Sequence, residues 1–82
     1  MNICSNSRKQ WNDILRELRE DRDLKQSDLA AVLQTTQQVY SRYEKGINEL
    51  PLHHIITICR YYHVSADYLL GLEPNLPFPK AK

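Results

Sequence analysis

The sequence predicts an all-α domain of five short helices and no strand. Three observations support this prediction. Apolar residues recur at helical spacing, the capping residues Thr36 and Ser65 stand at the starts of two segments, and Gly46 and Gly71 stand where those segments end. With 82 residues, of which 41% are hydrophobic and 26% are charged, the chain is long enough for one globular domain with a single core.

The first helix is predicted over residues 8–21, with Ser7 or a neighbouring residue as its cap. Its apolar residues follow the i, i+3, i+4, i+7 pattern of an amphipathic helix: Trp11, Ile14, Leu15 and Leu18. Charged residues fill the opposite face, so we expect one side of this helix to meet the core and the other to meet solvent.

The second helix is predicted over residues 26–33, and its buried edge is formed by Leu29, Val32 and Leu33. A very short connection leads to Thr36, the cap of a third helix that ends near Lys45. Tyr40 and Tyr43 are three residues apart and share a face, so they are expected to attach this helix to the core.

The fourth helix is predicted from Pro51 to Tyr62, because proline is tolerated in the first turn of a helix. Its apolar face is expected to comprise Leu52, Ile55, Ile56, Cys59 and Tyr62. A last short helix is predicted over residues 66–70, capped by Ser65 and ended by Gly71.

We expect residues 8–71 to form the folded domain, flanked by an N-terminal tail, 1–7, and a C-terminal tail, 72–82. Three prolines within six positions exclude a helix from the second tail. Leu76 and Phe78 in this tail are either disordered or part of a subunit contact, and the sequence leaves both interpretations open.

The chain is expected to be a cytoplasmic protein. No apolar run approaches the roughly 20 residues that a membrane span needs, and the N-terminus lacks the apolar segment of a secretory signal. In a reducing compartment Cys4 and Cys59 are expected to remain thiols, with Cys59 serving as a small residue of the core.

Four polar side chains share one face of the third helix, at positions i, i+1, i+4 and i+5: Gln37, Gln38, Ser41 and Arg42. Gln and Arg can make paired hydrogen bonds to the edges of adenine and guanine in the major groove of DNA. This pattern favours base contact, although a solvated helix face is the alternative. Val39 could meet a thymine methyl group or be partly buried.

The sequence offers no support for an enzyme, a cofactor or a metal site. It contains neither a glycine-rich phosphate loop nor a set of Ser, His and Asp, or Cys and His, with a plausible pocket. Cys59 and His63 are four residues apart, with His53 and His54 nearby. A structural zinc site needs four convergent ligands, however, and Cys59 is expected to face the core.

Four short motifs in order resemble the Cro/cI-type helix-turn-helix family, also called the XRE family, across residues 15–71. They are Leu15 to Glu20, Gln26 to Ala30, Tyr43 to Gly46 and Val64 to Gly71. The resemblance implies a five-helix, lambda-repressor-like domain whose second and third helices form the helix-turn-helix. The third helix would then be the recognition helix, which enters the major groove of double-stranded DNA.

Position by position, the resemblance implies that the recognition helix contacts bases through Gln37, Gln38 and Arg42, with Val39 as a further candidate. Contacts to the DNA phosphates are expected from Gln26, Lys25, Ser41, Lys45 and Asn48. Gln26 is also expected to brace Gln37, the first residue of the recognition helix.

The resemblance also implies a partly buried salt bridge between Arg19 and Glu44, which would fix the angle between the first and third helices. Three residues depart from the family pattern. Tyr40 stands where an aliphatic residue is usual, so its hydroxyl needs a partner or a path to solvent. Lys25 replaces a capping residue but brings a cation near phosphate, and Glu49 makes the following loop less basic.

The function implied by the resemblance is a sequence-specific DNA-binding transcriptional regulator, most simply a repressor of a pseudo-palindromic operator. A formal net charge of +1 indicates few phosphate contacts per subunit, so we expect a homodimer on half-sites about one helical turn apart. The alternative is a protein-interaction module, such as an antitoxin-like subunit whose main partner is another protein. The chain could also be one piece of a longer regulator.

Overall fold

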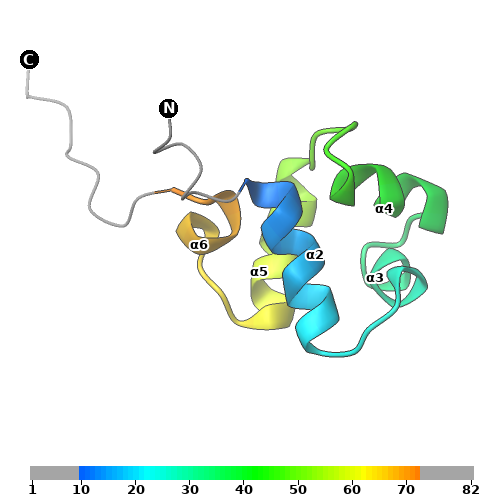
Figure 1. Ribbon diagram of the computed structural model, residues 1–82, viewed down its shortest axis with the longest axis horizontal. Coiled ribbons are helices and arrows are strands. Elements are labelled where there is room, and N and C mark those ends of the chain that lie inside the picture. The colour runs from blue at the N-terminus through cyan, green and yellow to red at the C-terminus, as the bar shows by residue number, and fades with distance from the viewer. Residues whose placement is uncertain (1–9, 73–82) are drawn as a thin grey trace, which may run out of the picture.

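The computed structural model describes residues 10–72, and every regular element in this range is a helix (Figure 1). In chain order the helices are α2 (Trp11–Asp21), α3 (Gln26–Val32), α4 (Gln37–Glu44), α5 (Leu52–Tyr62) and α6 (Ala66–Leu70). The prediction of an all-α fold with five helices is confirmed for this part of the chain. None of these helices is long and apolar enough to cross a membrane.

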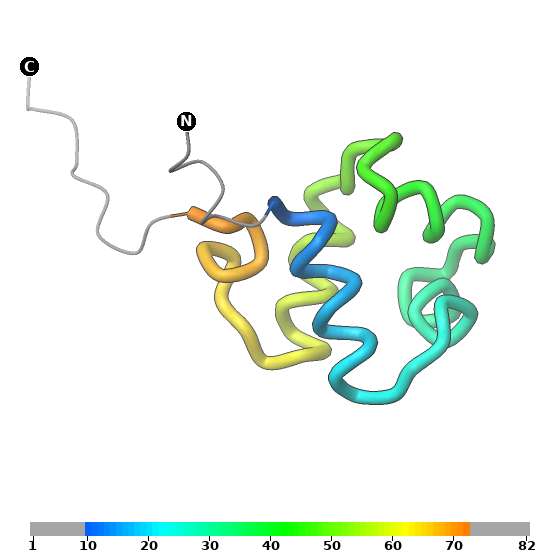
Figure 2. The backbone as a smooth tube through the Cα atoms, viewed as in Figure 1, coloured from blue at the N-terminus to red at the C-terminus, as the bar shows by residue number. Residues whose placement is uncertain are grey.

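Helices α2 and α5 form the centre of the domain, with α3 and α4 at one end and α6 at the other (Figure 2). Helix α2 connects the two ends, because it packs against both α4 and α6. This arrangement leaves the outer face of α4 uncovered by other helices, and Gln37, Gln38 and Arg42 on that face are exposed.

The core takes one fully buried large side chain from each helix: Leu15, Leu29, Tyr40, Ile58 and Leu69. Burial of such a side chain stabilises the fold by about 1.5–3 kcal/mol. Tyr43 is also buried, and its ring meets the Tyr40 ring edge to face, with 6.4 Å between the ring centroids. The prediction that both tyrosines attach α4 to the core is therefore confirmed.

The first helix begins later than predicted, at Trp11 instead of residue 8. Gln10 is the N-cap, with extended backbone and no side-chain capping bond, and its carbonyl oxygen accepts the first helical hydrogen bonds. Trp11 packs against the core, and packing is what stabilises a helix of this length. The predicted cap, Ser7, lies outside the described residues, as do Leu76 and Phe78.

The fourth predicted helix differs in two respects. Pro51 is the N-cap of α5, with ψ 153°, and so precedes the first turn. The inward face of α5 also differs from the predicted one, because Leu52 and Ile56 are 71% and 44% exposed, whereas Ile58 is fully buried. The face that meets the core follows the i, i+3, i+4, i+7 pattern through Ile55, Ile58, Cys59 and Tyr62.

The predicted caps of α4 and α6 are confirmed. The hydroxyl groups of Thr36 and Ser65 each accept a hydrogen bond from the backbone N–H three residues on, at 3.2 and 3.1 Å. Gly46 and Gly71 follow these helices with φ of 76° and 71°, the left-handed conformation that favours glycine.

Helix α3 begins without a capping side chain on Lys25, as the sequence indicated. The Asp28 carboxylate compensates by accepting a hydrogen bond from the Lys25 backbone N–H at 2.8 Å. This contact also places a negative charge in the first turn of α3, near the positive end of the helix dipole.

Candidate nucleic-acid interface

A tight turn over residues 33–36 joins α3 to α4. Gln34 takes a left-handed conformation, with φ 58°, and the Thr35 N–H donates to the Ala30 carbonyl at 2.9 Å. These features end α3 and redirect the chain, and Thr36 then caps α4. Two short helices joined by such a turn have the form of a helix-turn-helix.

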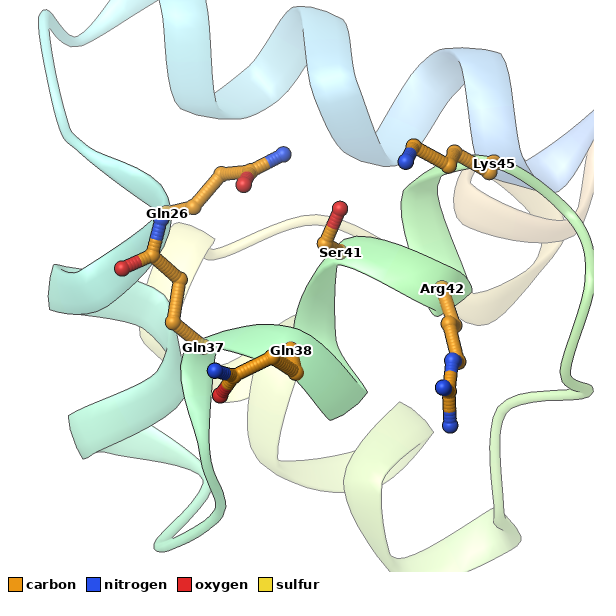
Figure 3. A pocket seen from close by; sticks show the side chains of 6 residues that line it. All are labelled: Gln26, Gln37, Gln38, Ser41, Arg42 and Lys45. Carbon is orange, nitrogen blue, oxygen red and sulfur yellow. The ribbon is translucent and has the colours of Figure 1, made fainter.

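Six side chains from α3, α4 and the residue that follows α4 line an open depression of about 360 Å³ on the outer surface of these helices (Figure 3). They are Gln26, Gln37, Gln38, Ser41, Arg42 and Lys45. All six were singled out from the sequence as candidate DNA contacts. The structure therefore brings together most of the predicted site on one surface.

The six side chains point in different directions. Figure 3 shows the ends of Gln26 and Lys45 directed toward each other over Ser41, whereas Arg42 leaves α4 on another side. Gln37, Gln38 and Arg42 are exposed, and Ser41 is half-buried. The surface thus offers amide, hydroxyl and guanidinium groups to a ligand from several angles.

Three of the predicted contact residues lie apart from this depression. Lys25 is exposed just before α3, and Asn48 is half-buried in the loop after α4. Val39 is also half-buried and packs against the core, which matches the second of its two predicted interpretations. Any contact that these residues make with a ligand would lie outside the depression.

The lining of the depression carries cations but no anion. Arg42 and Lys45 are exposed and positively charged, and the other four lining residues are neutral. Glu44 lies between them in sequence, but its side chain is only 3% exposed and is paired with Arg19. Such a surface suits phosphate groups and base edges, which present negative charge and hydrogen-bond acceptors.

The predicted salt bridge between Arg19 on α2 and Glu44 on α4 is present. Arg19 Nε lies 2.7 Å from Glu44 Oε2, and Arg19 Nη2 lies 3.0 Å from Glu44 Oε1. The third nitrogen of the guanidinium group, Nη1, donates a hydrogen bond to the Leu24 carbonyl oxygen at 2.9 Å. One arginine therefore fixes α4 against α2 and holds the turn that leads into α3.

Burial and hydrogen bonding oppose each other at Glu44. Burial alone raises the pKa of its carboxyl group, but the hydrogen bonds from Arg19 and Gln26, together with the nearby Tyr40 hydroxyl, outweigh burial and lower the pKa below its ordinary value. The same pairing raises the pKa of Arg19. Both groups are therefore held in their charged forms.

Two contacts of Glu44, one with its carboxylate and one with its backbone carbonyl, were not predicted from the sequence. Gln26 Nε2 donates to Glu44 Oε1 at 3.1 Å, so the contact observed for its amide is with Glu44 instead of Gln37. Asn12 Nδ2 lies 3.4 Å from the Glu44 carbonyl oxygen, beneath Gly46. No sequence spacing signals either contact, because the partners are 18 and 32 residues apart.

Tyr40 has no path to solvent, since its side chain is fully buried. Burial and the nearby Glu44 carboxylate raise the pKa of its hydroxyl well above the usual range. Tyr62 on α5 is also buried, and burial raises the pKa of its hydroxyl to about 12. Both hydroxyl groups are therefore neutral at any physiological pH.

The histidines at the start of α5 form ring contacts. The ring centroids of His53 and His54 are 4.2 Å apart, and the rings of His54 and Tyr43 pack in a T-shaped arrangement with 5.9 Å between their centroids. Across residues 10–72, no group of three or more His, Cys, Asp and Glu side chains is placed to hold a metal ion.

A capped polar helix, fixed to a small core and joined by a tight turn to the preceding helix, defines a helix-turn-helix protein. A family model described as Helix-turn-helix matches residues 15–69. The chain belongs to this family.

Comparisons with individual proteins agree with this assignment. The chain is 35% identical over 68 residues to an uncharacterised helix-turn-helix-type transcriptional regulator, YobD, of Bacillus subtilis. The match covers 83% of this chain and 60% of YobD, so the chain spans less than two thirds of that relative.

Two solved structures have a similar fold. A transcriptional regulator from Listeria innocua superposes with a TM-score of 0.76 at 24% identity, over 82% of this chain and 63% of that one. The c2 repressor of P22, solved with a synthetic operator, gives a TM-score of 0.72 at 18% identity, over 79% of this chain and 98% of the repressor. These likenesses establish a lambda-repressor-like fold.

Proposed function

We propose that this protein is a sequence-specific DNA-binding transcriptional regulator that acts as a repressor. The observation that carries the proposal is the gathering of six polar or cationic side chains on the outer face of the helix-turn-helix. The similarity to YobD, which is named a transcriptional regulator, supports it. The proposal involves no catalytic step, cofactor or metal.

In this proposal α4 is the recognition helix and enters the major groove. Gln37, Gln38 and Arg42 contact base edges, and the exposed part of the half-buried Val39 meets a thymine methyl group. Phosphates are contacted around this helix by Lys25, Gln26, Ser41, Lys45 and Asn48. The salt bridge of Arg19 with Glu44 holds the helix at a constant angle to the rest of the domain.

We further propose that the protein binds as a homodimer to a pseudo-palindromic operator. One subunit offers few cations to DNA, because the whole chain carries a formal net charge of +1. A second recognition helix one helical turn away would supply the affinity that one copy lacks. The proposed place of action is the cytoplasm, where Cys59, a free cysteine, would remain a thiol.

Selection of bound sequences from a random pool of double-stranded DNA tests this function. The purified chain should enrich an inverted repeat whose half-sites are centred about one helical turn apart. Binding to the enriched sequence should weaken steeply as salt rises, because phosphate contacts release counterions. The proposal is wrong if folded protein enriches no motif at low salt.

A protein-interaction module, such as an antitoxin-like subunit, is the second candidate. Exposed apolar side chains after α4 and along α5 favour it: Ile47 is 67% exposed and Leu52 is 71% exposed. Co-purification of a partner encoded by a neighbouring gene would support this candidate. The two functions are compatible in a protein that also represses its own operon.

A further inference from the structure

Tyr40 lies in the middle of α4, yet its hydroxyl group is in the core. The oxygen atom is shielded from solvent and has no hydrogen bond of good geometry to another described residue. A buried donor without a partner is unfavourable, and most buried polar groups in folded proteins are paired. The natural partner must therefore be an acceptor that lies close by and is itself incompletely paired.

Glu44 offers such an acceptor. A carboxylate accepts about four hydrogen bonds, two on each oxygen. Oε1 accepts hydrogen bonds from Arg19 Nη2 at 3.0 Å and from Gln26 Nε2 at 3.1 Å. Oε2 accepts one hydrogen bond, from Arg19 Nε at 2.7 Å. Among the hydrogen bonds of the described residues, one acceptor position on Oε2 is left over.

The two groups are within reach of each other. Tyr40 and Glu44 are four residues apart on α4 and therefore lie on the same face of the helix. The Tyr40 hydroxyl is among the groups that lower the pKa of Glu44, and Glu44 in turn raises the pKa of Tyr40, after the larger effect of burial.

We propose that Tyr40 is a positioning residue for DNA binding: its hydroxyl donates to the remaining acceptor position of Glu44, which in turn orients the Gln26 amide. The proposal rests on the DNA-binding function proposed above. It links the core to the interface, because Gln26 lines the depression on the outer face of α3 and α4. The second N–H of that amide and its carbonyl oxygen stay available to a ligand.

The variant Tyr40→Phe tests the first link in the free protein. It removes one oxygen atom and keeps the ring that packs against Tyr43. If Glu44 loses a donor, NMR titration of its carboxyl group should show the pKa moving upward, and the Gln26 side-chain amide signals should shift. A Glu44 titration and Gln26 signals equal to those of the wild type would overturn the proposal.

Tyr62→Phe is the matched control. The Tyr62 hydroxyl is also buried without a hydrogen bond among the described residues, but it belongs to α5. Tyr62 also interacts electrostatically with Glu44, so its removal should move the Glu44 titration less than Tyr40→Phe does and should leave the Gln26 signals unchanged. Equal changes in the two variants would contradict a specific role for Tyr40.

The second link is tested with DNA of the selected sequence. Tyr40→Phe should weaken binding about threefold to tenfold, the equivalent of one ordinary hydrogen bond. In a Gln26→Ala background the same substitution should have no further effect, because Tyr40 acts through Gln26. If the losses of DNA affinity caused by Tyr40→Phe and Gln26→Ala were additive, Tyr40 would not act through Gln26 and the proposal would be wrong. The NMR measurements need no DNA, so they separate failure of this inference from failure of the proposed function.

Discussion

Arg19 and Glu44 are 25 residues apart in sequence, and their side chains form a bidentate salt bridge. Arg19 Nε lies 2.7 Å from Glu44 Oε2, and Arg19 Nη2 lies 3.0 Å from Glu44 Oε1. The arginine belongs to α2 and the glutamate to the last turn of α4. Glu44 is buried, so its charge is compensated inside the protein instead of by water. The angle at which α4 is presented therefore depends on an ion pair in the interior.

Replacement of Arg19 by methionine should destabilise the fold by about 3–5 kcal/mol, because it leaves the buried Glu44 carboxylate uncompensated. Urea unfolding followed by circular dichroism measures this loss. The control is Arg16→Met, since Arg16 pairs with Asp13 at 3.7 Å on the surface and both side chains are more than 40% exposed. That variant should change stability by no more than about 0.5 kcal/mol.

Acid should remove the contribution of Glu44 to stability. The pKa of this carboxyl group is lowered in the folded state, so its contribution is complete above the ordinary value of 4.5. The contribution is lost progressively as pH falls from 4.5 through the lower folded pKa. The free energy of unfolding of the wild type, measured between pH 7 and pH 3, should therefore fall more steeply below 4.5 than that of Glu44→Gln. Parallel curves would show that Glu44 is not a source of acid sensitivity.

Gly46→Ala should destabilise the domain by at least about 1 kcal/mol. The backbone at Gly46 has φ 76°, and a Cβ atom there would lie 3.2 Å from Asn12 Nδ2. Thermal unfolding measures the effect, and Asn12→Ala in the same chain separates its two causes. The double variant should regain the part of the lost stability that is due to the contact between the new Cβ atom and Asn12. The part due to alanine in a left-handed backbone conformation should remain lost.

Arg42 and Lys45 should affect DNA binding in different ways. Arg42→Ala should reduce discrimination at one base position by about 1–3 kcal/mol and relax the selected motif there. Lys45→Ala should weaken binding to all sequences about equally and reduce the slope of log affinity against log salt by about one. Binding of both variants to the selected site and to single-base changes of it, at several salt concentrations, measures these effects. A uniform loss for Arg42→Ala would make that residue a phosphate contact.

The existence and order of the helices could be predicted from the sequence because these features are local. Apolar spacing defined α2, while Thr36 and Ser65 marked the starts of α4 and α6 through a bond to a residue three positions away. The polar face of α4 followed in the same way, since residues at i, i+1, i+4 and i+5 must lie together on any helix. The resemblance to the family added the pairing of Arg19 with Glu44.

Predictions failed where local sequence was ambiguous. Leu52 and Ile56 extend an apolar stripe on α5, and only the way in which α5 packs against the rest of the domain, α6 included, decides that they face solvent. The start of α2 was misplaced for a similar reason, because Gln10 is exposed and Trp11 is the first described residue that packs against the core.

The sequence by itself determined which segments become helices and which polar groups α4 presents, because helical periodicity and capping act over a few residues. The tertiary structure alone decided that Gln26 donates to Glu44, that Asn12 lies beneath Gly46 and that the Tyr40 hydroxyl has no path to solvent. These relationships depend on how separate helices approach one another. Close packing of the core sets that approach, and no spacing along the chain records it.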